Sequence, residues 1–323
     1  MKYVYVLTSS ESDFYYEQFY ISVTSLRLHN QRANIVVIVD SKTKEGLTGK
    51  RSGFKQHVSE IVTITVPQEL SQKEASRWIK TSINKHISGD FIFIDCDTVI
   101  TGKLDPGFSP KVNVGAVLDN HVSLSNHHLA LYFEERRKKS GFNFSETGQY
   151  FNSGVIFYRD TAQSNDFFSL WHSLWLTASK KGIHQDQPAL NQANHEMGGV
   201  LTELSGEWNC QITHNGLPFL SNAKIIHCYA TSMKLYNCPF LPASLPVLSS
   251  VKETGAISEE LMEMLKDPKA AFEPYSRIIS GETELDAINS KLFSLLLFIR
   301  KRMPGLFKKT NSFILKTRAK TQK

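Results

Sequence analysis

The sequence has few cysteines and no long apolar run. Its 323 residues include only Cys96, Cys210, Cys228 and Cys238, which form neither a CxxC pair nor a regular framework. A domain of this size does not need disulfides, so a reducing compartment is the simpler interpretation. No run approaches the ~20 apolar residues that span a bilayer, and the start lacks the features of a signal peptide. We therefore expect a cytoplasmic protein, or one held at the cytoplasmic face of a membrane.

Acidic residues are missing from the end of the chain. None follows Asp286, whereas ten of the 37 lysines and arginines do, and without these ten the formal net charge would change from +6 to −4. The basicity therefore belongs to a tail, and the mildly acidic body argues against nucleic acid as a partner. The hydrophobic content of 41% and charged content of 21% are ordinary for a globular protein.

Short β-branched or aromatic runs alternate with segments of helical patterning. The expected strands are residues 3–7, 35–39, 91–94, 112–118 and 154–158. Between the first two, Phe19, Val23 and Leu26 recur at helical spacing and predict a crossover helix over residues 14–29. This alternation indicates an α/β fold with a mixed, mostly parallel central sheet flanked by helices. Because single cores stop growing at ~250–300 residues, we expect one main domain over residues 1–250 and a helical extension over 251–323.

The most informative local pattern lies where an expected strand ends. The apolar residues 91–94 are followed by Asp95 and Asp97. The two-residue period of a strand would direct both carboxylates to one side, where they could bind one hard cation and through it a diphosphate. An Asp-x-Asp pattern also occurs by chance. At a buried strand end, however, two carboxylates repel each other without a partner cation. Asp40 and Asp119 follow other expected strands, at the edge where open α/β sheets bind ligands.

Three weaker patterns follow this one. They are the segment 150–158 with Asn152 and Ser153, the segment 184–191 with Asp186 and Gln187, and the short apolar run that His227 closes. A lone histidine in such a run is also commonly a satisfied core residue, so both interpretations of His227 stay open.

Taken together and in this order, these segments resemble glycosyltransferase family 8, the family of glycogenin and the bacterial lipopolysaccharide galactosyl- and glucosyltransferases. The resemblance covers residues 2–234 and includes residues 204–211, which are similar to the family's LP-x-x-WN-x-Q stretch. It implies a GT-A (Rossmann-like) fold and a retaining enzyme that transfers glucose or galactose from a UDP-sugar. The implied cofactor is Mn²⁺ or Mg²⁺, and the implied acceptor is a glycan or lipid-linked glycan in lipopolysaccharide or polysaccharide synthesis.

The resemblance also implies roles for individual residues. Asp95 and Asp97 match the metal-binding pair, and His227 matches the third metal ligand. The residues implied in catalysis are Asn152, Asp186 and Gln187. The residues implied in binding the donor are Leu7, Thr8, Ser9, Lys80, Asp95, Cys96, Asp97, Asp119, Ser153 and Lys234. A departure follows His227: Ala230 stands where the family has glycine, and Lys234 comes one position late, which puts the closure over the diphosphate in doubt.

Two charged segments lie outside these patterns. Residues 121–149 are expected to form a solvated helix with flanking loops, or part of the acceptor side of a cleft. In the tail, Leu292, Leu295, Leu296 and Ile299 form an apolar stripe flanked by cations, before Pro304. Such a helix is typical of peripheral membrane binding, although it could also pack on the body.

Two alternative functions remain open. A sugar nucleotidyltransferase would have a glycine-rich phosphate loop after the first strand, and residues 8–12 contain no glycine. A non-catalytic protein that binds a nucleotide sugar or glycan would fit the altered segment after His227, but the intact Asp95, Asp97, Asp186 and Gln187 argue against it.

Overall fold

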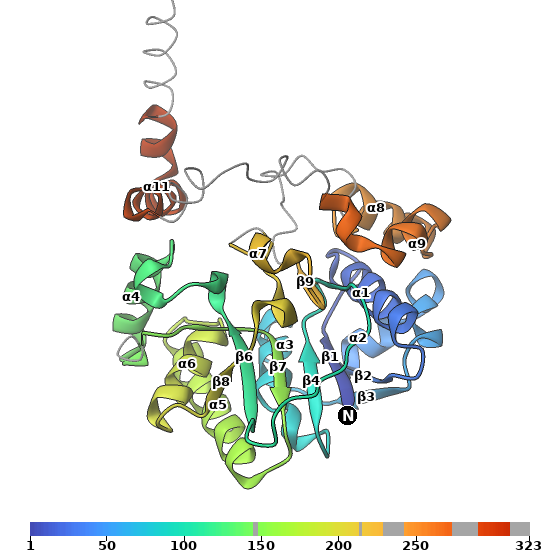
Figure 1. Ribbon diagram of the computed structural model, residues 1–323, viewed down its shortest axis with the longest axis horizontal. Helices are drawn as coiled ribbons and strands as arrows, with labels where there is room; N and C mark the ends of the chain where they lie inside the picture. The colour runs from blue at the N-terminus through green and yellow to red at the C-terminus, as the bar shows by residue number, and fades with distance from the viewer. Residues whose placement is uncertain (145–147, 213–214, 229–241, 273–289, 311–323) are drawn as a thin grey trace, which may run out of the picture.

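The fold is built on a seven-stranded sheet in the order β3-β2-β1-β4-β7-β6-β8, seen at the centre of a computed structural model of the chain (Figure 1). The structure describes residues 1–144, 148–212, 215–228, 242–272 and 290–310. The strands are β1 (Lys2–Leu7), β2 (Asn34–Asp40), β3 (Glu60–Ile64), β4 (Phe91–Ile94), β6 (Val114–Leu118), β7 (Phe151–Tyr158) and β8 (Leu201–Glu203). Strands β1 to β4 run parallel, β7 runs antiparallel to its neighbours β4 and β6, and β6 pairs with β8 in parallel. The predicted α/β fold with a mixed, mostly parallel sheet is confirmed.

A second, two-stranded sheet lies beside the main one. Its strands β5 (Thr98–Ile100) and β9 (Ile225–His227) are antiparallel, with Thr98 opposite His227. This pairing brings residues that are far apart in sequence next to the end of β4.

Helices cover both faces of the main sheet. The longer ones are α1 (Tyr15–His29), α3 (Gln72–Thr81), α4 (Ala130–Ser140), α5 (Ala162–Lys180), α6 (Gln187–Glu196), α8 (Leu245–Thr254), α9 (Glu259–Lys266) and α11 (Lys291–Arg302). The shorter ones are α2 (Ser41–Gly46) and α7 (Leu217–Leu220). Single 3₁₀ turns are η1 (Gly49–Arg51), η2 (Gly53–Gln56), η3 (Ile83–Lys85), η4 (Asp119–His121), η5 (Leu124–Asn126), η7 (Gly206–Asn209) and η8 (Pro268–Phe272).

The alternation of side chains along the strands divides the core into two layers. In β1, Tyr3 and Tyr5 pack on the face covered by α1, α8 and α9, while Val4 and Val6 pack on the face covered by α3, α5 and α6. Because strands buried on both faces need apolar residues at every position, the continuous apolar runs of β1, β2 and β4 follow directly from this layering.

Several predicted elements are confirmed, with differences at their ends. The predicted helix over residues 14–29 is α1, and its Phe19, Val23 and Leu26 are fully buried. Strand β6 begins at Val114, two residues later than predicted, and β7 begins at Phe151, three residues earlier. The side-chain amide of Asn191 bonds both the N–H and the carbonyl of Phe151. These bonds stabilise an extended start for β7 that the polar residues did not indicate.

The C-terminal helices occupy two places. Helices α8 and α9 pack on α1 through Leu248, Val251, Leu261 and Leu265 (upper right in Figure 1). The expected boundary between residues 250 and 251 falls inside α8, and the division into two domains stays a proposal. Helix α11 lies against α4 (upper left in Figure 1). Among the described residues, no helix is long and apolar enough to cross a membrane.

Candidate active site

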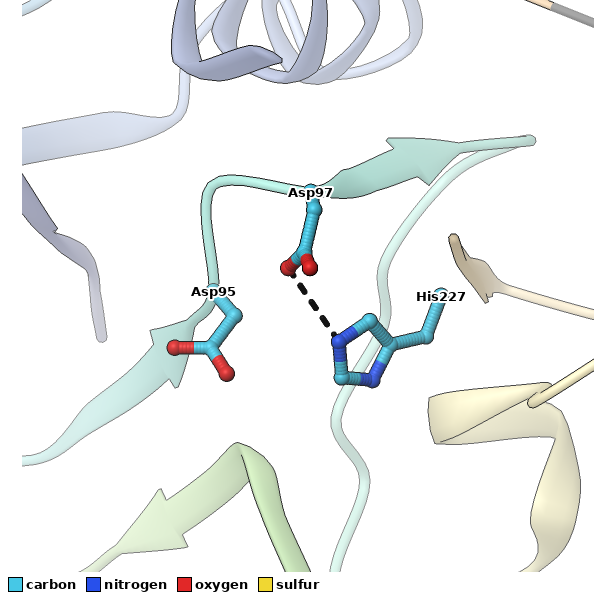
Figure 2. Close-up of side chains that lie close together, drawn as sticks. All are labelled: Asp95, Asp97 and His227. Atoms are coloured by element: carbon cyan, nitrogen blue, oxygen red, sulfur yellow. Dashed lines mark hydrogen bonds and ion pairs between the residues drawn. The ribbon is translucent and has the colours of Figure 1, made fainter. Parts of the chain in front are cut away.

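Two carboxylates and an imidazole converge beside the end of β4. Asp95 follows the strand directly, Asp97 leads into β5, and His227 ends β9 (Figure 2). The possible ligand atoms of the three residues all lie within 4.8 Å of one another, and Nε2 of His227 lies 3.2 Å from Oδ1 of Asp97. Residues 95–97 form a turn, so this convergence comes from the turn and the β5–β9 pairing and not from continued strand alternation.

The donor set fits a hard divalent cation. Nδ1 of His227 lies 2.9 Å from Oδ1 of Asn209, which can only accept a hydrogen bond, so the neutral ring carries its proton on Nδ1. The lone pair of Nε2 then faces the Asp97 carboxylate at 3.2 Å. Two electron-rich atoms at this distance are stabilised by a cation that both can bind. Carboxylate oxygens with one imidazole nitrogen suit Mn²⁺ or Mg²⁺.

A buried lysine connects the carboxylates of the site. Nζ of Lys80 lies 3.2 Å from Asp95 and 3.2 Å from Asp186, and 3.3 Å from Oγ of Ser153. Arg77, one turn earlier on α3, approaches Asp186 at 3.7 Å. Lys80 is only 5% exposed, so its charge is screened little by solvent. The site therefore holds fixed charges of both signs.

The surroundings shift the pKa values of the acids in different directions. Burial raises the pKa of Asp95, although the positive charge of Lys80 opposes this effect. Burial would also raise the pKa of Asp186, but the neighbouring Lys80 and Arg77 hold it below its usual value. Asp186 is therefore anionic at neutral pH.

These charges line a cleft with two connected parts. The larger part has a volume of about 420 Å³ and is lined by Asp119, Asn152, Ser153, Asp186 and Gln187 among others. The smaller part, about 90 Å³, is lined by Leu7, Thr8 and Cys96. Both parts share Asp95 and Asp97. The possible metal site thus lies where the two parts meet.

The structure does not bring every predicted residue to this cleft. Ser9 lines a separate cavity of about 530 Å³ next to Asp40, and its hydroxyl donates to Asp13. Cys96 does line the smaller part of the cleft, although its thiol donates to the carbonyl of Val6. Lys234 lies outside the described residues.

The sequence alone did not identify several residues at the cleft. Tyr15 and Gln18 on α1 and Arg77 on α3 line both parts. Arg77 is three positions before Lys80. If the segment had been predicted as a helix, this spacing would have placed Arg77 on the same face as Lys80 and identified it. Tyr15 and Gln18 carried no such signal.

The charge-dense segment after Leu118 forms the predicted helix and also contributes to the lining of the cleft. It forms the solvated helix α4, yet Leu129, Tyr132, Phe133 and Arg136 line the larger part of the cleft. The rings of Phe133 and Tyr150 stack with centroids 4.2 Å apart. Aromatic side chains therefore form part of the lining of the larger part, together with Asp119 and Asp186.

Comparison with solved structures agrees with this fold. The galactosyltransferase LgtC in complex with donor and acceptor sugar analogues matches with a TM-score of 0.51 and 16% identity, over 81% of this chain and 99% of that one. An active-site mutant of LgtC matches with a TM-score of 0.52 and 14% identity, with the same coverage. The apo form of mouse xyloside xylosyltransferase 1 matches with a TM-score of 0.47 and 12% identity, over 71% of this chain and 97% of that one.

The sequence comparison is more specific. No curated protein sequence matches the chain. Residues 7–235, in contrast, match the family described as "Glycosyl transferase family 8", and this range contains both parts of the cleft and all three possible metal ligands. The sheet order, the cleft and the family match agree, and the chain is a GT-A glycosyltransferase that belongs to glycosyltransferase family 8.

Proposed function

We propose that the enzyme is a retaining, Mn²⁺-dependent transferase that moves a hexose from a UDP-sugar to a glycan or lipid-linked glycan. The observation that carries the proposal is the convergence of Asp95, Asp97 and His227 where the two parts of the cleft meet. A cation held there would lie beside both parts of the cleft. The smaller, narrow part is sized for a flat base or ribose, and the larger, wider part is sized for a sugar and an acceptor.

The residues of each part suit these roles. Leu7, Thr8 and Tyr15 offer apolar and hydrogen-bonding contacts to a nucleoside in the narrow part. Asp119, Asn152 and Ser153 offer oxygens and an amide to sugar hydroxyls in the wider part. Lys80 lines the wider part beside Asp95, where its charge can neutralise a diphosphate.

Departure of a diphosphate from a sugar leaves positive charge on the anomeric carbon and negative charge on the leaving group. A bound divalent cation would supply Lewis-acid stabilisation of that negative charge. Lys80 and Arg77 add fixed positive charge in a site that needs no reorganisation during the reaction. The chain therefore stabilises mainly the leaving group.

The retaining outcome rests on the family resemblance, and the state of Asp186 and Gln187 in the wider part of the cleft bears on its mechanism. Asp186 is 5% exposed and paired with Lys80, so its carboxylate is not free to attack the anomeric carbon. Gln187 is a poor nucleophile, and its side-chain oxygen accepts a hydrogen bond from the Ser153 N–H at 3.4 Å. We infer that the leaving diphosphate directs the acceptor hydroxyl to the same face, with Gln187 close to the reacting carbon.

Helix α11 supports a location at the cytoplasmic face of a membrane. It presents Leu292, Leu295 and Leu296 with 67%, 42% and 38% of their surface exposed, and Arg300, Lys301 and Arg302 form its last turn. The helix lies against α4, whose Tyr132 lines the wider part of the cleft. A surface-bound α11 would therefore hold the cleft near a lipid-linked acceptor.

The test is release of UDP from a panel of UDP-sugars by the full chain, with and without Mn²⁺, beside an Asp97→Ala variant. We expect slow hydrolysis of one UDP-hexose that requires Mn²⁺ and falls at least ~100-fold in the variant, because a ligand of the cation is lost. If no donor is hydrolysed, a titration of binding follows. Absence of any metal-dependent binding of a UDP-sugar would overturn the proposal, while binding without turnover even with glycan acceptors would favour a non-catalytic protein.

A further inference from the structure

A continuous chain of side-chain hydrogen bonds joins His227 to His127, from one side of the cleft to the other. We propose that Asn209 and His127 are positioning residues. Asn209 orients the metal-binding imidazole of His227. His127 orients the carboxylate of Asp119, which forms the sugar-binding wall of the wider part together with Asn152 and Ser153. This inference deepens the proposed function and rests on it. It assigns roles to Asn209, which lies in the stretch 204–211 but had no role of its own, and to His127, which no sequence pattern had identified.

The first link is at the metal site. Oδ1 of Asn209 accepts the Nδ1–H of His227 at 2.9 Å, which leaves Nε2 as the ligand atom beside Asp97. Asn209 is fully buried and His227 is 3% exposed, so water does not readily replace this bond. A second partner that fixes the tautomer of a metal-binding histidine commonly changes metal affinity by about 10- to 100-fold.

The middle links run through Asn152. Nδ2 of Asn209 donates to Oδ1 of Asn152 at 2.9 Å, and the Gly154 N–H donates to the same oxygen at 2.8 Å. The orientation of the Asn152 amide is thereby determined. Its Nδ2 then donates to Oδ1 of Asp119 at 2.7 Å.

The last link is His127, which is 1% exposed. The Leu129 N–H donates to its Nδ1 at 3.0 Å, so Nδ1 is an acceptor. The proton is therefore on Nε2, which donates to Oδ2 of Asp119 at 3.0 Å. Both oxygens of Asp119 accept bonds from this chain, and its carboxylate is held in one orientation in the wall of the cleft.

Each link has one possible direction, because a backbone N–H determines the acceptor at Asn152 and at His127. Asn209 hydrogen-bonds both the metal ligand His227 and Asn152 of the sugar-binding wall. A change of its amide to a carboxylate keeps an acceptor for His227 but removes the donor to Asn152. The two variants Asn209→Ala and Asn209→Asp therefore separate the two roles.

We expect Asn209→Ala to weaken Mn²⁺ binding by about 10- to 100-fold, measured on the full chain with UDP by electron paramagnetic resonance of free Mn²⁺. Asn209→Asp should keep Mn²⁺ affinity within a few fold of wild type, yet lower kcat for UDP-sugar hydrolysis about fivefold or more through the lost bond to Asn152. Asn194→Ala is the matched control, since Asn194 is also buried and bonds the Leu201 N–H on the far side of α6. It should reduce stability only.

His127→Phe keeps an aromatic ring, and it removes both the donor to Asp119 and the acceptor of the Leu129 N–H. It should leave Mn²⁺ affinity within about twofold of wild type and change kcat or KM for the UDP-sugar about fivefold. His127→Gln, which restores a donor, should recover most of that loss.

A folded Asn209→Ala with wild-type Mn²⁺ affinity overturns the role of Asn209, and so does an equal loss of affinity in both Asn209 variants. A wild-type kcat and KM in His127→Phe overturns the role of His127. If neither Asn209 variant folds, ¹⁵N NMR of the wild-type imidazole of His227 decides, because a proton on Nε2 contradicts the inference. If the wild-type protein does not bind Mn²⁺ at all, the proposed metal site itself is overturned. Failure of the positioning roles and failure of the metal site are therefore distinguishable.

Discussion

At the scale of single residues, the geometry of the metal site depends on the absence of a side chain at Gly154. Gly154 lies in β7 directly beside the imidazole of His227. A Cβ at this position would lie 2.7 Å from Nδ1 of His227 and 2.9 Å from Oδ1 of Asn152, and would contact the ring carbon Cε1 more closely still. Both neighbours are buried and hydrogen-bonded, so neither can move aside without breaking a bond.

Gly154→Ala should therefore displace His227 and weaken Mn²⁺ binding by about tenfold or more, with a loss of stability of about 1–3 kcal/mol from overpacking. Titration with Mn²⁺ and thermal unfolding of the same sample measure the two effects. Gly102→Ala is the control, because a Cβ there meets no atom within 4 Å. Wild-type metal affinity in Gly154→Ala would contradict the argument.

Local patterns and the family resemblance together predicted much of the site. Asp95, Asp97, Asn152, Asp186 and Gln187 all line the cleft, as expected from local patterns and the family resemblance. Ser9 does not, because its hydroxyl turns away to bond Asp13. Whether the hydroxyl faces the cleft or Asp13 depends on tertiary contacts, which no local pattern contains.

At the scale of elements, α3 and α5 position the lysine and the aspartate of the site, because α3 carries Lys80 and the indole N–H of Trp171 on α5 donates to the Asp186 carbonyl. Nδ1 of His172 on α5 bonds Oγ1 of Thr81 on α3 at 2.7 Å, next to Lys80. The ring of Trp78 meets that of His172 edge to face at 5.6 Å. Burial, with smaller contributions from Lys85 and His86, lowers the pKa of His172 to about 4.

This contact should make stability depend on pH. Between about 4 and 6.5 the unfolded state binds a proton at His172 and the folded state does not, so stability falls as the pH falls through this window. We expect a loss of about 2 kcal/mol, after allowance for partial screening by solvent. Urea unfolding at pH 7 and pH 4.5 measures this loss of stability. The variant His172→Gln has no titrating group at this position, so its loss between the two pH values should be smaller by about that amount. An equal pH dependence in both proteins would refute the prediction.

The elements also show where local patterning is sufficient. Strands β1, β2 and β4 and helix α1 were predicted because burial on one or both faces leaves a period in the sequence. The start of β7 and its antiparallel direction were not, since they depend on the bonds of Asn191 and on pairing with β4 and β6.

At the scale of the whole molecule, positive charge is separated from the acidic body. Ten cations follow Asp286, and the described part of this segment lies beside α4 at one end of the molecule (Figure 1). Some of this charge is used internally: Arg302 pairs with Glu135, and Lys301 lies 4.1 Å from the ring centre of Tyr132. The other exposed cations of the tail are available to bind an anionic membrane surface.

If the tail binds membranes, the full chain should sediment with vesicles that contain anionic lipid and not with neutral ones, and added salt should release it. Replacement of Arg300, Lys308 and Lys309 by glutamine should weaken this binding by about 100-fold, at ~1 kcal/mol per cation. The matched control replaces Lys55, Lys103 and Lys111, which are exposed on the body. Equal effects of the two triple variants would show that net charge and not the tail governs binding.

The sequence by itself determined the class of fold and the candidate chemistry, because periodicity records which faces are buried and residue type limits which ligands can bind. Only the tertiary structure decided which side chains meet. Asp97 and His227 are 130 residues apart, and the β5–β9 pairing brings them together. The bonds that hold His227, Asn209, Asn152, Asp119 and His127 in one chain arise in the same way. Contacts between distant segments follow from how the layers pack, and no local pattern carries that information.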